Sequence, residues 1–143
     1  MGRRFVSFGI GGSRWCLPVA EVVQIVRHEN VHELPDAQPP VAGVITLHGD
    51  VVPVLDLRER LAAAAVEGAG SWQRRILVVR TAGRPYGILV DEVRELVDLE
   101  DGRDTDKRKP LPSCAAGWGL RGEEMLPILD LARAMESGGG RPP

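Results

Sequence analysis

Apolar residues along the chain occur in short runs that are separated by glycine, proline and charged residues. Residues 6–8 and 76–79 are rich in β-branched and aromatic side chains, and each run is followed by a glycine-containing turn and a second apolar run. Two such runs joined by a short loop with glycine predict a β-hairpin. Closely spaced short strands with glycine and proline between them favour small barrels over a βαβ sheet. We therefore expect a mainly β fold.

The same hydrophobic pattern occurs twice. Residues 5–26 align without gaps on residues 76–97 at an offset of 71, and residues 52–61 align on residues 126–135 at an offset of 74. Two copies are too few for a solenoid, which needs at least three repeats. The repeat therefore predicts two similar small units within one chain.

We expect residues 1–72 to form the first barrel half, with an N-terminal strand able to pair with the second half, and residues 73–143 to form the second. Residues 67–71 are rich in glycine and alanine and are predicted to be the linker. Residues 98–113 are charged and contain proline, which predicts a long surface loop. A C-terminal helix should follow the last strand, with a disordered tail from about residue 137.

Each copy of the motif PxLDL is predicted to lead into a short helix. Asp56 is a suitable N-cap and Glu59 stands at the third helical position, as in a capping box. Asp130 is placed to cap the second copy in the same way. Because capping explains these carboxylates, they do not indicate paired acid–base catalysis. Including turn glycines and strand prolines, the positions given a structural role are Gly12, Pro53, Asp56, Gly83, Gly87, Pro127 and Asp130.

The composition argues against most alternative classes. The net charge is −2 with both signs interspersed, and aromatic residues make up 4% of the chain. A nucleic-acid-binding barrel, the main alternative for small barrels, needs a basic groove with stacking aromatics. No apolar run approaches the ~20 residues that span a bilayer, and the N-terminus lacks the features of a signal peptide, so a cytoplasmic location is expected.

A literal metallopeptidase pattern, HENVH, covers residues 28–32. In zinc peptidases the two histidines of H-E-x-x-H lie on one face of a helix. Here the preceding residues 22–26 are mostly β-branched, which favours a strand, and Pro35 restricts the chain soon afterwards. We expect a turn between two strands with solvent-facing histidines, and zinc catalysis remains a remote alternative. Cys16 and Cys114 are far apart and indicate neither a metal site nor a redox pair.

Other catalytic signatures are missing from the sequence. It contains no G-x-S-x-G, P-loop or dinucleotide-binding fingerprint. No catalytic, cofactor-binding or metal-binding residue is therefore assigned, and an enzyme is not expected.

Four segments together resemble the CheW family of bacterial chemotaxis coupling proteins. The most specific pieces are GVITLHGDVVPVLDLR at residues 43–58 and GILVDEV at residues 87–93. They lie within PPVAGVITLHGDVVPVLDLRERL and ILVVRTAGRPYGILVDEVRELV, and GWGLRGEEMLPILDLARAM follows at residues 117–135. With residues 5–10 and 15–26, the resemblance covers nearly the whole chain in the family order.

The resemblance implies two five-stranded SH3- or OB-like β-barrels packed over a shared core, with a short helix after each PxLDL strand. It implies an adaptor without catalysis or cofactor, which neither binds nucleic acid nor inserts into a membrane. The expected partners are the regulatory domain of a CheA-type histidine kinase and the cytoplasmic tip of methyl-accepting chemoreceptors. The protein would be cytoplasmic and recruited to membrane-associated receptor arrays.

In this family one face and the groove between the barrels contact partners. Val22 and Ile25 are apolar residues suited to anchor a helix, although core packing explains each of them more readily. Gly43, Gly49 and Gly87 serve backbone geometry or close strand approach more readily than contact. The candidate partner-binding residues are Val22, Gln24, Ile25, Gly43, His48, Gly49 and Arg58.

Two of these positions depart from the family pattern. Gln24 stands where CheW proteins usually carry glutamate, and His48 stands where they carry arginine. A fixed positive charge is thereby replaced by an imidazole ring. These changes suggest a coupling protein specialised for one receptor–kinase system, including a pathway that does not control motility.

Overall fold

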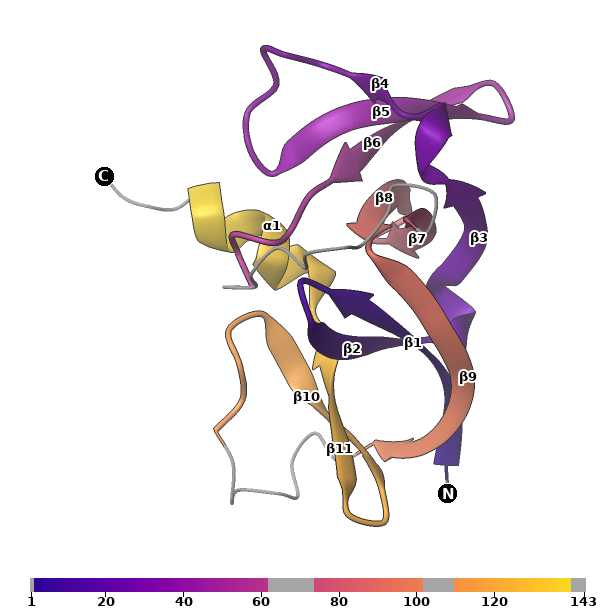
Figure 1. Ribbon diagram of the computed structural model, residues 1–143, viewed down its shortest axis with the longest axis vertical. Helices are drawn as coiled ribbons and strands as arrows, with labels where there is room; N and C mark the ends of the chain where they lie inside the picture. Colours follow the sequence, from indigo (N-terminus) through magenta and orange to yellow (C-terminus); the bar gives the residue numbers. More distant parts are fainter. Residues whose placement is uncertain (1, 62–73, 102–109, 140–143) are drawn as a thin grey trace.

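Strands make up most of the chain, which confirms the expected mainly β fold (Figure 1). The computed structural model describes residues 2–61, 74–101 and 110–139. The strands are β1 (Gly2–Ile10), β2 (Ser13–Pro18), β3 (Val22–Arg27), β4 (His32–Glu33), β5 (Val41–Leu47), β6 (Asp50–Leu55), β7 (Arg75–Thr81), β8 (Arg84–Val90), β9 (Glu92–Asp101), β10 (Ala115–Arg121) and β11 (Glu124–Leu129). The helical elements are the 3-10 turns η1 (Val19–Glu21) and η2 (His28–Asn30) and the α-helix α1 (Leu131–Gly139).

The strands form two sheets that exchange hairpins between the repeats. One is a closed barrel in the order β1-β2-β11-β10-β9, and the other is a six-stranded sheet in the order β3-β7-β8-β6-β5-β4. The N-terminal hairpin β1–β2 thus completes the barrel of the second repeat, and β7–β8 joins strands of the first. Strands β7, β8, β6, β5 and β4 follow one another as β1, β2, β11, β10 and β9 do, and β3 pairs with β7 as β9 pairs with β1. The sequence boundary at residue 72 therefore does not coincide with the boundary between the sheets.

The expectation of two five-stranded barrels agrees with the closed barrel but is wrong for the other half, where the strands form a six-stranded sheet. In the closed barrel, β9 runs without a break from its pairing with β1 to its pairing with β10. Its counterpart in the other half is divided by η2, so β3 pairs with β7 and the short β4 pairs with β5. This interruption leaves β3 and β4 at opposite edges of a six-stranded sheet.

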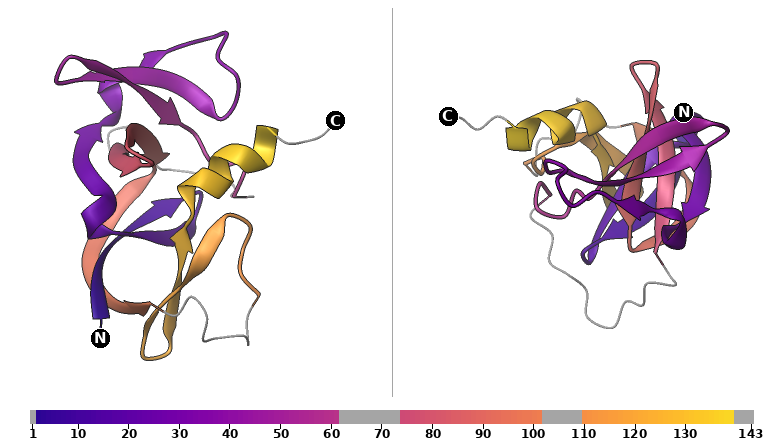
Figure 2. Two further views of the ribbon diagram at one scale, coloured as in Figure 1. Left: turned by 180° about the vertical axis from the view of Figure 1, so that it is seen from behind. Right: turned by 90° about the horizontal axis from the view of Figure 1, so that it is seen from above.

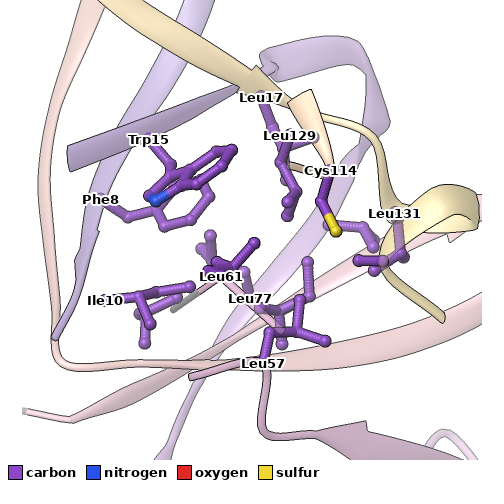
Figure 3. Close-up of a cluster of buried hydrophobic side chains, with 14 of the residues drawn as sticks. Phe8, Ile10, Trp15, Leu17, Leu57, Leu61, Leu77, Cys114, Leu129 and Leu131 are labelled. Atoms are coloured by element: carbon purple, nitrogen blue, oxygen red, sulfur yellow. The ribbon is translucent and has the colours of Figure 1, made fainter. Parts of the chain in front are cut away.

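Three buried clusters form the core. The largest lies between the two sheets and includes Phe8, Trp15, Leu57, Leu77 and Leu129 (Figure 3). A second cluster around Phe5 and Leu126 fills the closed barrel. The third lies inside the six-stranded sheet and consists of Ile45, Val52, Val54, Ile76 and Val78. Because the central cluster draws side chains from both sheets, the two halves share one core.

The two PxLDL motifs are capped through different residues. Asp130 precedes α1, and its Oδ1 accepts a hydrogen bond from the Arg133 backbone N–H at 3.0 Å, which is the predicted cap. After Asp56 the described residues form a turn in which the Leu61 N–H donates to the Leu57 carbonyl oxygen at 2.9 Å, and Asp56 Oδ1 accepts from the Arg58 N–H at 3.1 Å. The described contact of Asp56 is thus with Arg58 rather than with Glu59, and most of the expected first helix falls on residues 62–73, outside the described part.

Two further boundaries differ from expectation. β9 continues to Asp101, so the first residues of the segment 98–113 belong to a strand because they pair with β1 and β10. α1 continues to Gly139, past the expected start of the tail, and residues 140–143 lie outside the description. No helix within the described ranges is long and apolar enough to cross a bilayer.

The repeated glycines and prolines occupy matched positions. Gly12 (φ 85°) and Gly83 (φ 77°) each take the second place of a two-residue hairpin turn, a left-handed position that favours glycine. Pro53 precedes the β6–β8 pairing at Val54, and Pro127 precedes the β11–β2 pairing at Ile128. The missing N–H of each proline therefore costs neither parallel ladder a hydrogen bond.

Candidate functional site

The edge strand β3 carries three of the candidate partner-binding residues. Val22 is half-buried against the central core, whereas Gln24 is exposed. Ile25 lies opposite the fully buried Leu77 and is 45% exposed, and its neighbour Val23 is 48% exposed. An isolated exposed apolar residue needs no explanation, but several close together on an edge strand are typical of an interaction surface.

The structure adds Leu96 to this surface. Leu96 is on β9, lies opposite the buried Val6, and is 61% exposed. Val6 and Leu77 belong to the same central cluster, so Leu96 and Ile25 border one core from two strands. Figures 1 and 2 show β3 and β9 along the same side of the molecule. We call Val23, Ile25 and Leu96 the apolar strip.

The sequence repeat contained the signal for Leu96. At the offset of 71, Leu96 aligns with Ile25, and Val93 aligns with Val22. Val22 and Val93 both pack against the central cluster, so aligned positions have the same surroundings. The list of candidates named Ile25 without this counterpart, although the alignment of the repeats was enough to identify it.

The β5–β6 hairpin holds three more candidates, which the structure separates by role. A Cβ on Gly43 would lie 2.5 Å from the backbone oxygen of His32 and 2.8 Å from Val31 Cγ1, so Gly43 permits the close approach of β4. His48 and Gly49 are exposed at the tip of the hairpin and have φ angles of 53° and 85°. Gly87 resembles Gly43, because its Cβ would lie 2.7 Å from Ile76 Cγ2.

The registers of the two hairpins match residues of the two halves differently from the sequence alignment. By sequence, His48 aligns with Arg121 in the motif L-x-G. In the structure Leu47 pairs with Asp50 and Arg121 pairs with Glu124, so Arg121 takes the place of Leu47. The left-handed first turn residue is His48 in one hairpin and Gly122 in the other. His48 therefore adopts a backbone conformation that costs a non-glycine residue energy.

Arg58 is held in place by Asp56. Arg58 Nε and Nη2 donate to the two carboxylate oxygens of Asp56 at 3.2 and 2.9 Å. Burial raises the pKa of the Asp56 carboxyl, but the Arg58 hydrogen bonds and the charges of Arg58 and Arg74 outweigh this effect and lower it overall. Both residues line an open depression of about 450 Å³ together with Pro39, Pro40, Val41, Ala42 and Glu59.

Asp56→Asn is expected to lower the free energy of unfolding at pH 7 by about 1 kcal/mol. Because the pKa of Asp56 is lowered in the folded state, its contribution is present above the usual carboxyl range and is lost as pH falls through the folded value. Urea denaturation at pH 7 and at pH 3.5 should therefore show a difference from wild type that shrinks at the lower pH. An equal difference at both pH values would contradict the ionic role, and Asp36→Asn, in an exposed loop, is the control.

A network of four charges ties together four strands of the closed barrel. Arg14 on β2 contacts Glu124 on β11 at 3.1 Å, and Arg121 on β10 contacts Glu124 at 2.7 Å. Both arginines also lie 3.9 Å from Glu95 on β9. The hydrogen bond from Arg121 is the main cause of the lowered pKa of Glu124. With Glu92, Val93 and Arg94, three of these residues line a polar depression of about 400 Å³.

The HENVH segment has the predicted turn geometry. Residues His28–Asn30 form the 3-10 turn η2, Val31 is extended, and His32 belongs to β4. His32 is exposed, as expected, whereas His28 is half-buried. The helix on which a zinc peptidase carries both histidines is therefore not formed. Among the described residues, no group of three or more His, Cys, Asp or Glu is placed to hold a metal ion.

Comparison with known proteins gives one consistent result. The CheW-like domain model matches residues 4–138. The chain is 26% identical to the chemotaxis protein CheW of Klebsiella aerogenes, covering 96% of this chain and 84% of that protein. It is 31% identical to the chemotaxis protein CheW of Rhizobium meliloti, covering 82% and 72% respectively.

A solved structure supports the fold independently. The scaffolding protein TtCheW from Thermoanaerobacter tengcongensis superposes with a TM-score of 0.77 at 22% identity, covering 92% of this chain and 86% of that one. The agreement extends from the repeated motifs, through the two sheets with their shared core, to the family match over almost the full length. The chain therefore belongs to the CheW-like domain family.

Proposed function

We propose that this chain is a non-catalytic adaptor in bacterial chemotaxis or a related chemosensory pathway, coupling chemoreceptors to a CheA-type histidine kinase. The observation that carries the proposal is the CheW-like match over residues 4–138, in a family of scaffolds rather than enzymes. The related proteins are named as chemotaxis proteins, and the solved relative is named as a scaffold. An adaptor needs surfaces rather than an active site, and the apolar strip is such a surface.

The apolar strip suits the helical tip of a receptor. Ile25 on β3 and Leu96 on β9 lie opposite Leu77 and Val6 of the central core, and Val23 is exposed close to Ile25 on β3. An amphipathic helix binds by placing its apolar face against such residues.

The remaining candidates are proposed to bind the kinase regulatory domain. Gln24, His48, Gly49 and Arg58 are polar or turn residues on the half that contains the six-stranded sheet. Because Gln24 and His48 replace charged family residues, we propose that they adapt this surface to a particular kinase and receptor. Binding to both partners would recruit the protein to membrane-associated receptor arrays without inserting this chain into the membrane.

Pairwise binding tests the proposal. Labelled chain is titrated with the regulatory domain of the CheA-type kinase from the same genome and, separately, with a trimmed receptor helical hairpin. Saturable binding of each is expected, and a double-stranded DNA fragment should not bind. Failure to bind any kinase domain and any receptor tip from that genome would overturn the proposal, as would tight DNA binding or a stoichiometric zinc content with peptidase activity.

A further inference from the structure

The segment of residues 32–55 lacks two attachments that its repeat counterpart has, a continuous edge strand and a network of ion pairs. This segment contains β4, β5 and β6, which lie together at one end of the molecule (Figure 1). On one side it is joined to the sheet by two β6–β8 pairs, Val54 with Gly87 and Leu55 with Ile88, where the counterpart has the one β11–β2 pair of Ile128 with Cys16. On the other side it is joined through η2 rather than by a continuous strand. We call residues 32–55 the flap.

The counterpart hairpin β10–β11 is held on both sides. The uninterrupted β9 pairs with β10 through Glu100 and Asp101. Arg14 links β2 to Glu124 of β11, and Arg121 of β10 approaches Glu95 of β9. Each exposed ion pair contributes little alone, but a network that spans four strands restrains their relative movement.

The flap lacks the residues for the same network. The repeat places Pro85 at the position of Arg14 and Gln24 at that of Glu95. The hairpin registers place Leu47 at the position of Arg121 and Asp50 at that of Glu124. Three of these four counterparts are uncharged. The flap is instead held by aliphatic packing of Ile45, Val52 and Val54 against Ile76 and Val78.

From this asymmetry we propose that the flap is a hinged unit that opens while the closed barrel remains folded. Its hinges are η2 and the end of β6, where the chain leaves the flap. Gly43, His48 and Gly49 move with the flap, whereas Val22, Gln24 and Ile25 stay on β3, which is paired with β7. The HENVH turn therefore serves as a hinge between two groups of candidate partner-binding residues.

The hinge gives the protein a way to respond to its partners. A partner that touches both β3 and the hairpin tip binds one arrangement of the flap better than the others and so shifts the population toward it. This step rests on the proposed function, whereas the hinge itself does not. The two claims can thus fail separately.

Amide hydrogen exchange of the free protein tests the hinge. Repeat-matched amides that join each hairpin to the rest of its sheet are compared, those of the β6–β8 pair Val54 with Gly87 and those of the β11–β2 pair Ile128 with Cys16. The flap amides are expected to be about tenfold or more less protected, because local opening is cheaper than opening of the barrel. Equal or greater protection of the flap amides would overturn the proposal.

An engineered ion pair between the flap and β8 tests whether the missing charge network is what lets the flap open. Pro85→Arg with Asp50→Glu copies the Arg14–Glu124 pair into the flap, and Pro85→Arg with Asp50→Gln is the matched control without the pair. Exchange at Val54 and Gly87, which join the flap to β8, should slow in the first variant relative to the second, provided that circular dichroism shows both to be folded. Equal exchange in the two variants would contradict the role of the network.

Hydrogen exchange in the presence of a partner tests whether binding changes the opening of the flap. With saturating kinase domain or receptor fragment, protection of residues 32–55 should rise more than that of residues 115–129. Unchanged flap protection in a confirmed complex would reject the coupling to partners, while the free-protein measurement still decides the hinge. Absence of any complex would count against the proposed function alone.

Discussion

Replacing Ile25 and Leu96 together by glutamate is expected to weaken binding of the receptor helical fragment by at least about 30-fold, the size of a typical hot-spot loss. Both side chains are exposed and border the same core, so a helix on the apolar strip would bury two unpaired carboxylates. Titration of the labelled receptor fragment, followed by fluorescence anisotropy, measures the change.

The fold should tolerate this double substitution. Exposed positions usually change stability by no more than about 0.5 kcal/mol each, so the urea midpoint should stay near that of wild type. Leu111→Glu is the matched control, because Leu111 is also exposed but precedes β10 outside the strip. Unchanged receptor binding in the double variant, or an equal loss in the control, would show that the strip is not the docking surface.

Gly43→Ala is expected to lower the free energy of unfolding by about 2–3 kcal/mol, at the upper end of the usual cost of overpacking. The new methyl group would overlap the backbone oxygen of His32 and the side chain of Val31. Because backbone atoms cannot rotate away, β4 must separate from β5. Urea denaturation measures the loss, and hydrogen exchange should report it first in β4 and β5.

Gly49→Ala separates this packing cost from the cost of backbone conformation. Gly49 has φ 85°, and no heavy atom of the described residues lies within 4 Å of the place that its Cβ would take. Only the left-handed backbone penalty of about 1 kcal/mol therefore applies. A larger loss for Gly49→Ala than for Gly43→Ala would contradict the packing role of Gly43. If Gly43→Ala kept wild-type stability but lost partner binding, Gly43 would be a contact residue instead.

Local features of the fold could be predicted from the sequence because their causes are local. The turn glycines Gly12 and Gly83 and the cap at Asp130 depend on residues within a few positions of each other. The exchange of hairpins between the halves was anticipated only as an N-terminal strand able to pair with the second half, and the full exchange could not be predicted. The two repeats have nearly the same hydrophobic pattern, so β1–β2 satisfies either sheet equally well at that level.

The contact between Asp56 and Arg58 has a local cause that the sequence pattern hid. Asp56 and Asp130 are equivalent in the repeat, yet Asp56 is followed two residues later by Arg58, where the second copy has Ala132. The Arg58 side chain binds both carboxylate oxygens of Asp56, which adds an interaction absent from a simple helix cap. A pattern of capping residues does not reveal this competition.

The candidate site was predicted only in part. β3 was recognised as a strand with apolar and polar positions, but exposure depends on how the two sheets meet, which the sequence does not specify. Leu96 is the repeat counterpart of Ile25, but its exposure beside the core follows from the packing of Val6 in the central cluster, which the sequence does not specify. HENVH was interpreted as a turn, but its effect on closure of the sheet required the strand order.

The most direct test of the adaptor account is formation of a ternary complex. The chain is mixed with the regulatory domain of its CheA-type kinase and with the receptor helical fragment, and the mass of the eluted species is measured by light scattering. The account predicts one species that contains all three components, and loss of the receptor fragment alone from that species in the Ile25→Glu, Leu96→Glu variant. Competition between the two partners for one site, or binding of neither, would contradict it.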